Sequence, residues 1–136
     1  MTSEQIIKKL KSLANPKAIE GMKRFAVGGA NTLGINIPTL RKMAKEIGKD
    51  HAVAIEIWES GIHEARILAS MIDDPAQLSE KQMDKWVADF DSWDVCDQTM
   101  MNLFGKSPVA FKKAKEYQAK ISSDIFSPEI IEAYNN

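Results

Sequence analysis

The apolar residues recur at a helical spacing along almost the whole chain, and no stretch alternates between apolar and polar residues as a half-buried strand does. The pattern therefore predicts an all-α protein. We expect helices over residues 4–14, 16–25, 38–47, 50–59, 63–72, 79–90, 93–104 and 108–120. The helix over 63–72 is apolar on most sides, which predicts a central, buried position.

Capping residues and helix breakers set these boundaries. Ser3 is an expected N-cap, and Asp91-Ser92 is expected to cap the helix over 93–104, with Asp91 as the cap residue. Ser79 and Gln82 fit a capping box, and Pro38 suits a first helical position. Short helices joined by tight turns favour stacked antiparallel helix pairs over a bundle of long helices. Periodicity alone leaves other folds built from short helices open.

The length and composition fit one globular domain. The chain has 136 residues, of which 44% are hydrophobic and 27% charged, as in ordinary soluble domains. Cys96 is the single cysteine, which excludes an intrachain disulfide and a multi-cysteine metal site. No apolar run is long enough to span a membrane, so we expect a cytoplasmic protein without membrane attachment.

The charges are balanced overall but unevenly spread. The net charge of −1 excludes a polybasic protein that binds nucleic acid through bulk charge. Residues 1–50 hold ten basic and four acidic residues, a balance of +6, whereas residues 51–91 hold three and nine, a balance of −6. Most basic side chains, Arg41 and Lys42 among them, are expected to be solvated. Across successive helices, however, several could align along one groove and contact a phosphate backbone.

The seventh expected helix carries a carboxylate in an apolar stripe. Trp93, Asp97, Met100 or Met101 and Phe104 fall on one face of this helix. Burying an unpaired carboxylate is costly, so Asp97 is either hydrogen-bonded to a neighbouring helix end or lines a cleft. The first reading is purely structural. In the second, a carboxylate beside an aromatic wall stabilises an oxocarbenium-like sugar or orients a water, as in glycosidic bond cleavage.

His63 and Arg66 lie three residues apart at the start of the expected central helix. In a structural reading, Arg66 pairs with an acid of an adjacent helix. In a functional reading, the two side chains contact a phosphate. No second histidine completes a zinc-protease motif and no nucleophile triad has a recognised spacing, so the residues predict no metal site.

Three stretches of the chain resemble one known family. They are Gly-Ile-Asn-Ile-Pro-Thr-Leu-Arg over 34–41, His-Glu-Ala-Arg-Ile-Leu-Ala over 63–69 and, above all, 83–97 with its Ser-Trp-Asp-Val-Cys-Asp string. Together they resemble the DNA alkylation repair family, the AlkD-type DNA glycosylases. The resemblance implies an α-α superhelix, a solenoid of HEAT-like antiparallel helix pairs, over residues 1–120. Residues 121–136 are then a divergent segment, either a short helix or disordered.

The same resemblance implies a function and a site. The family binds double-stranded DNA along a concave, basic face and excises N3- or N7-alkylated purines by hydrolysis of the N-glycosidic bond, without a metal or organic cofactor. Its Trp and Asp one helical turn apart fall on Trp93 and Asp97. Asp97 would stabilise the positively charged sugar or position the water, and Trp93 would contact the deoxyribose. The expected DNA-binding residues are His63, Arg66, Arg41 and Lys42.

The chain departs from the family pattern toward its C-terminal end. Family members are longer and place an active-site arginine on the next repeat, whereas no arginine follows Arg66 here. We therefore expect a shortened relative whose last repeat is covered by an apolar cap or by a second copy of the chain. The candidates for the cap are Ile125, Phe126, Ile130 and Ile131. Two functions stay open: an alkylpurine DNA glycosylase, or a catalytically inactive helical-repeat module that binds DNA or protein.

Overall fold

The structure is a computed structural model that describes residues 1–24, 31–109 and 112. These residues form seven α-helices and two short 3-10 turns and contain no strand, which confirms the all-α prediction. The helices are α1 (Ser3–Ser12), α2 (Pro16–Arg24), α3 (Ile37–Ile47), α4 (His51–Trp58), α5 (His63–Ile72), α6 (Glu80–Asp89) and α7 (Trp93–Asn102). The 3-10 turns are η1 (Pro75–Gln77) and η2 (Phe104–Lys106).

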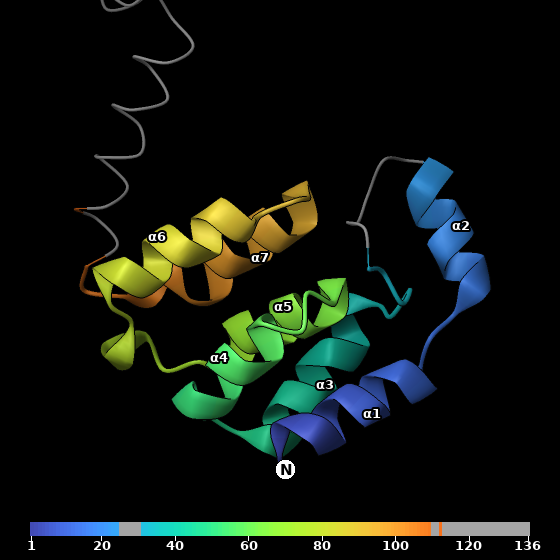
Figure 1. Cartoon of the computed structure of the whole chain (residues 1–136), viewed down its shortest axis with the longest axis horizontal. Coiled ribbons are helices and arrows are strands. Elements are labelled where there is room, and N and C mark those ends of the chain that lie inside the picture. The colour runs from blue at the N-terminus through green and yellow to red at the C-terminus, as the bar shows by residue number, and fades with distance from the viewer. Residues whose placement is uncertain (25–30, 110–111, 113–136) are drawn as a thin grey trace, which may run out of the picture.

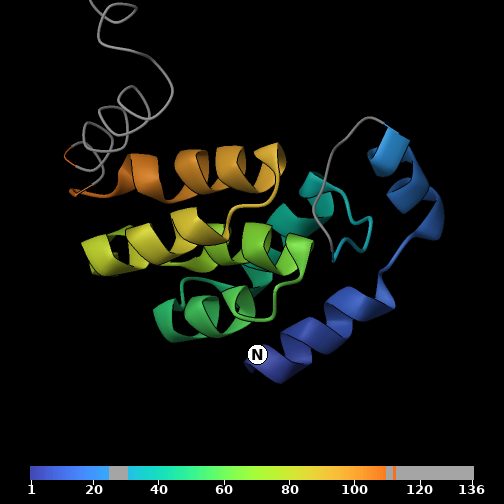
Figure 2. The same cartoon turned by 45° about the horizontal axis from the view of Figure 1, so that its top comes forward.

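Helices α4 and α5, and helices α6 and α7, form antiparallel pairs that stack on one another, and α1 and α3 pack beside them, whereas α2 lies apart from the stack (Figures 1 and 2). Within the α4/α5 pair, His51 at the start of α4 contacts Asp73 just beyond the end of α5. Between pairs, His63 at the start of α5 contacts Asp94 in the first turn of α7, so these two helices run in the same direction. Helix α5 packs against both α3 and α7. Helices α3, α5 and α7 therefore form one layer, and α1, α4 and α6 lie behind it.

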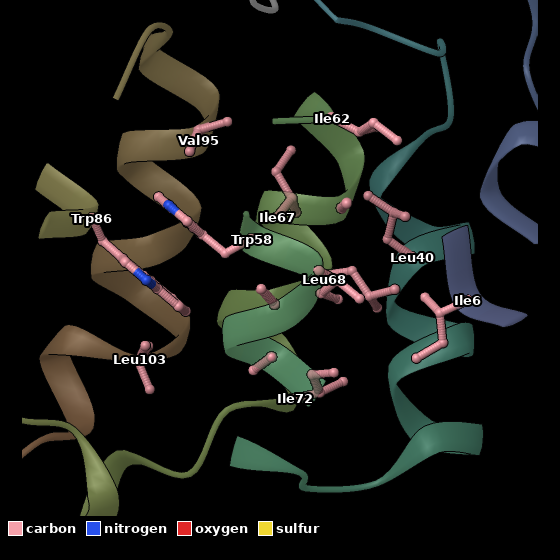
Figure 3. Close-up of a cluster of buried hydrophobic side chains, with 14 of the residues drawn as sticks. Ile6, Leu40, Trp58, Ile62, Ile67, Leu68, Ile72, Trp86, Val95 and Leu103 are labelled. Carbon is pink, nitrogen blue, oxygen red and sulfur yellow. The ribbon is translucent and has the colours of Figure 1, made fainter. Parts of the chain in front are cut away.

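The hydrophobic core lies between the two layers (Figure 3). Trp58 of α4 and Trp86 of α6 are fully buried and stack with ring centroids 4.0 Å apart and an interplanar angle of 3°. Both indoles therefore point inward and join α4 to α6 in the core. Eight of the ten α5 residues are buried, which confirms the central position predicted for this helix.

A buried carboxylate ties the end of α5 to the helices on either side. Asp73 is fully buried and accepts hydrogen bonds from His51 Nδ1 at 2.6 Å and Gln82 Nε2 at 2.6 Å. The expected capping box at the start of α6 is therefore only half right. The Ser79 hydroxyl accepts from the Gln82 amide, but the Gln82 side chain reaches to Asp73.

A second buried carboxylate joins α5 to the loop before α3. Glu64 is fully buried, and its oxygens accept the backbone N–H groups of Leu33, Gly34 and Ile35 at 2.8, 2.7 and 3.1 Å. Gly34 has φ +80°, and a Cβ there would lie 2.5 Å from the carbonyl oxygen of Asn15, so this position requires glycine. The contact links two of the stretches that carry the family resemblance.

Two expected N-caps are wrong by one residue. The Thr2 hydroxyl, and not Ser3, caps α1: it accepts from the Gln5 amide while the Gln5 side chain accepts from the Thr2 amide. The Ser92 hydroxyl, and not Asp91, caps α7. In each case neighbouring residues are both good caps, and the sequence does not fix which one adopts the extended backbone of the cap position.

Some predictions lie outside the described residues. The expected helix over 108–120 lies almost wholly beyond them, as does the segment 121–136 with the apolar cap proposed for it.

Candidate nucleic-acid interface

Helix α7 begins where Ser92 caps it and turns one side toward the core. Val95, Thr99 and Leu103 of this side are fully buried. Asp94 and Asn102 face α5, where they contact His63 and Ser70. The opposite side of α7 is therefore left at the surface.

The stripe that carries the candidate catalytic residues occupies this opposite side. Trp93 is 81% exposed, Asp97 is exposed, and Met100 and Met101 are 40% and 59% exposed. The carboxylate of Asp97 is therefore at the surface and is not buried by the apolar residues of its stripe. Phe104 leaves the stripe because α7 ends before it, and its side chain is buried. Helical spacing predicts which residues share a face. It does not predict whether another element covers that face.

Helix α3 presents cations beside a shallow apolar depression. Arg41 and Lys42 are both exposed on this helix, and of the two Arg41 lines the depression, whereas Lys42 lies one turn before Glu46 on another side of the helix. The depression lies between α3 and α5 and is lined by Arg41, Ala44, Lys45, Gly48, Lys49 and Met71. The Lys49 ammonium donates to the Met71 carbonyl oxygen at 2.9 Å. The basic residues of the N-terminal third, which include Lys45 and Lys49, were expected to be mostly solvated with several aligned along a groove, but their proximity to Met71 arises from the packing of α3 on α5.

The orientation of α3 can be read from its other contacts. Glu46 pairs with Lys9 of α1 at 3.2 Å, so that side of α3 faces the layer behind. Arg41 precedes Glu46 by five residues and therefore points about 140° away around the helix. Arg41 and Lys45 accordingly lie on the side of the α3/α5/α7 layer turned away from α1.

Trp93 and Asp97 lie on the same side of this layer, since α7 turns its core positions toward the helices behind and its Asp94 side toward α5. We call this surface the layer face. It carries Arg41, Lys45, Met71, Trp93 and Asp97.

His63, a candidate phosphate ligand, is only 3% exposed. Its Nε2 lies 2.5 Å from Asp94 Oδ2. Burial raises the pKa of Asp94, but hydrogen bonds with His63 and Ser92 outweigh burial and hold that pKa below its ordinary value. Asp94 is therefore ionised at neutral pH. A phosphate could reach the imidazole only by displacing this carboxylate, and a DNA contact of His63 stays a prediction.

Arg66 is partly buried and joins α5 to both neighbouring helices behind the layer. Its Nε donates to the Trp58 carbonyl oxygen at 3.3 Å, and its Nη1 donates to the Asp89 carbonyl oxygen at 2.9 Å. Its guanidinium also lies 5.2 Å from the centroid of the Trp58 ring. The geometry favours the structural reading of Arg66, with backbone carbonyls in place of the expected acid.

The residues that the structure describes also bear on metal binding and on membrane insertion. Within them, no three His, Cys, Asp or Glu side chains are grouped so that they could hold a metal ion. Within the same residues, no helix is both long and apolar enough to cross a membrane.

Comparison with known proteins gives a family match and a structural match. A family model described as "DNA alkylation repair enzyme" matches residues 6–124. One solved structure matches 88% of this chain with a TM-score of 0.78 at 21% sequence identity. It is described as "A new family of proteins related to the HEAT-like repeat DNA glycosylases with affinity for branched DNA structures". This chain spans about half of that protein, 51% of its length.

No curated protein matches the sequence. The structural likeness supports the predicted fold, because the stacked antiparallel pairs resemble a HEAT-like repeat protein. The family model covers most of the chain, including the exposed Trp93 and Asp97. The chain therefore belongs to the DNA alkylation repair enzyme family.

Proposed function

We propose that the layer face binds double-stranded DNA containing alkylated bases, and that Trp93 and Asp97 promote excision of N3- or N7-alkylated purines. The observation that carries this proposal is the exposed indole one helical turn from an exposed carboxylate, on the same face as Arg41 and Lys45. An indole in water contributes nothing to folding by burial. Together with the exposed Met100 and Met101 of the same helix, it forms an exposed apolar patch, which is typical of a binding surface.

The width of the layer face suits a duplex. Helices α3 and α7 are separated by α5, so their axes lie about 16–20 Å apart if each neighbouring pair has the usual spacing of about 8–10 Å. This span exceeds the roughly 12 Å width of the major groove of B-DNA. Cations on α3 and the Trp93–Asp97 pair on α7 would then contact different backbone segments of one duplex.

The chemistry follows from the charge of the substrate. N3- or N7-alkylation makes the purine cationic, so the glycosidic bond breaks with its electron pair going to the base, which leaves neutral. The positive charge develops on the deoxyribose, where the Asp97 carboxylate stabilises it. Water then adds to the anomeric carbon and loses a proton to solvent. Bound DNA would exclude water from around Asp97 and strengthen this electrostatic stabilisation.

Binding without excision is the second candidate function. The solved structure of similar fold is described as having affinity for branched DNA. Arg41 and Lys45 beside the apolar depression would serve such binding whether or not Asp97 acts on a glycosidic bond.

The two functions separate in one set of assays. We expect methylated duplex DNA to bind in a salt-dependent manner and to release 7-methylguanine or 3-methyladenine. A branched DNA of the same length and an unmodified duplex serve as comparisons. Salt-dependent binding with no released base, and with preference for the branched DNA, would favour the second function.

A further inference from the structure

His63 and Asp94 connect the start of α5 to the start of α7. The His63 Nε2 and the Asp94 Oδ2 are 2.5 Å apart, and the histidine is almost completely buried. The backbone amide of His63 is itself held by the carbonyl oxygen of Asn31 at 2.9 Å. The imidazole therefore occupies a fixed place in the central helix, and its close contact with Asp94 Oδ2 restrains the Asp94 carboxylate.

Asp94 lies between the two candidate catalytic residues in sequence. It follows Trp93 by one residue and precedes Asp97 by three, within the first turns of α7. An ionised side chain in the first turn also interacts favourably with the helix dipole. Any rotation or fraying of this turn would move both Trp93 and Asp97, since the three residues share one short backbone segment.

Few packing contacts fix the position of the Trp93 side chain. Its side chain is 81% exposed, so it makes few packing contacts of its own. A second polar contact between α5 and α7 lies at the far end of the helices, where Asn102 Nδ2 donates to the Ser70 hydroxyl at 3.2 Å. Asn102 is eight residues beyond Asp94, or about 12 Å along the helix. Of these two contacts between α5 and α7, the His63–Asp94 contact is the nearer to Trp93.

We infer that His63 and Asp94 are positioning residues, which fix the first turn of α7 so that Trp93 and Asp97 project together from the layer face. This inference rests on the proposed function, because positioning matters for excision only if Trp93 and Asp97 act on DNA. It gives the buried His63 a role through Asp94 in place of the direct phosphate contact expected from sequence. The pair itself does not touch the substrate.

The test uses variants that separate packing from hydrogen bonding. His63→Leu fills most of the space but has no donor, whereas the amide of His63→Gln can donate from nearly the position of Nε2. Asp94→Ala removes the other partner and perturbs less buried volume. Asp91→Asn is the matched control, because it removes an exposed carboxylate close to Trp93 that lies outside the pair.

The main readout is the fluorine NMR spectrum of the full chain labelled with 5-fluorotryptophan. Trp58 and Trp86 are buried and stacked, so their resonances report on the fold, while the Trp93 resonance reports on the start of α7. We expect the Trp93 resonance to move toward its unfolded position in His63→Leu and Asp94→Ala, with the other two unchanged. It should stay in place in His63→Gln and Asp91→Asn.

Single-turnover base release gives the functional readout. We expect His63→Leu and Asp94→Ala to slow release about tenfold, since small misplacements of reacting groups have effects of that size or larger. Their affinity for DNA should change far less. An unmoved Trp93 resonance and unchanged release in both variants would overturn the inference. If the wild type releases no base, the excision proposal fails, and the Trp93 resonance alone decides whether the pair positions α7.

Discussion

The buried Glu64 carboxylate offers a sharp test of how this fold is held together. It accepts hydrogen bonds from the three backbone N–H groups of residues 33–35, which lie just before the N-cap of α3. Glu64→Gln keeps the shape of the side chain but replaces one acceptor oxygen with an NH2 group. Because all three partners are donors, the new NH2 group has no acceptor at this site.

The size of the effect follows from the geometry. One Glu64 oxygen accepts from Gly34 and Ile35, and the other accepts from Leu33. Either orientation of the glutamine therefore leaves at least one buried amide facing a donor. A hydrogen bond to a charged group contributes about 1.5–3 kcal/mol, and the surviving bonds lose their charge assistance. We expect the free energy of unfolding to fall by about 2–4 kcal/mol, out of roughly 5–15 kcal/mol for a typical domain.

Urea titration monitored by circular dichroism measures this change. The midpoint should fall while the dependence on urea stays the same, since the surface exposed on unfolding is unchanged. Glu56→Gln, at an exposed position of α4, is the matched control and should change stability by less than about 0.5 kcal/mol. A Glu64→Gln variant as stable as this control would refute the reasoning that the carboxylate holds the loop.

Three further predictions concern charge and the surface. Arg41→Gln should lower the slope of log affinity against log salt for DNA by about one, the value for one lost phosphate contact. Burial, aided by the charge of Asp97, raises the pKa of the Cys96 thiol, so a thiol reagent should react slowly with it at pH 7, and faster in Asp97→Asn. Burial raises the pKa of Asp89, but hydrogen bonds from Trp58 and a lysine outweigh it and lower that pKa in the folded protein. Ionised Asp89 therefore stabilises the folded protein at any pH above its unfolded pKa, and this contribution is lost as the pH falls through its folded pKa. The free energy of unfolding of Asp89→Asn should accordingly fall less steeply on the acid side.

Each of these predictions has a control at an exposed position elsewhere. Lys81→Gln, on α6 behind the layer, should leave the salt slope unchanged. Asp91→Asn should leave the reactivity of Cys96 unchanged, and Glu56→Gln should keep the acid side of the stability profile. Equal effects of a variant and its control would contradict the corresponding prediction.

Local chemistry made much of the fold predictable from sequence. The bounds of α5 agree with the expected 63–72, because Gly61 precedes this helix and Asp73-Asp74-Pro75 follows it. Its apolar residues on most sides predicted the central position. Trp58 and Trp86 were predictable as anchors because each falls on the apolar side of its helix.

The long-range polar contacts were not predictable in the same way. Glu64 binds amides about thirty residues earlier in the chain, and nothing in its local sequence names them. The His63–Asp94 contact likewise depends on the parallel stacking of α5 and α7. The spacing of Trp93 and Asp97 gave their shared face, but its exposure is a property of the stacked helices. For the candidate site, the sequence therefore supplied the residues and the packing decided their roles.

The measurement closest to the central claim is single-turnover release of 7-methylguanine and 3-methyladenine from methylated duplex DNA. It compares the wild type with Asp97→Asn, and Asp91→Asn serves as a control for the loss of one nearby negative charge. We predict release by the wild type and the control and a loss of release in Asp97→Asn, with folding and DNA affinity retained. Equal release by wild type and Asp97→Asn, or no release by well-folded wild type, would contradict the proposal that the layer face excises alkylated purines.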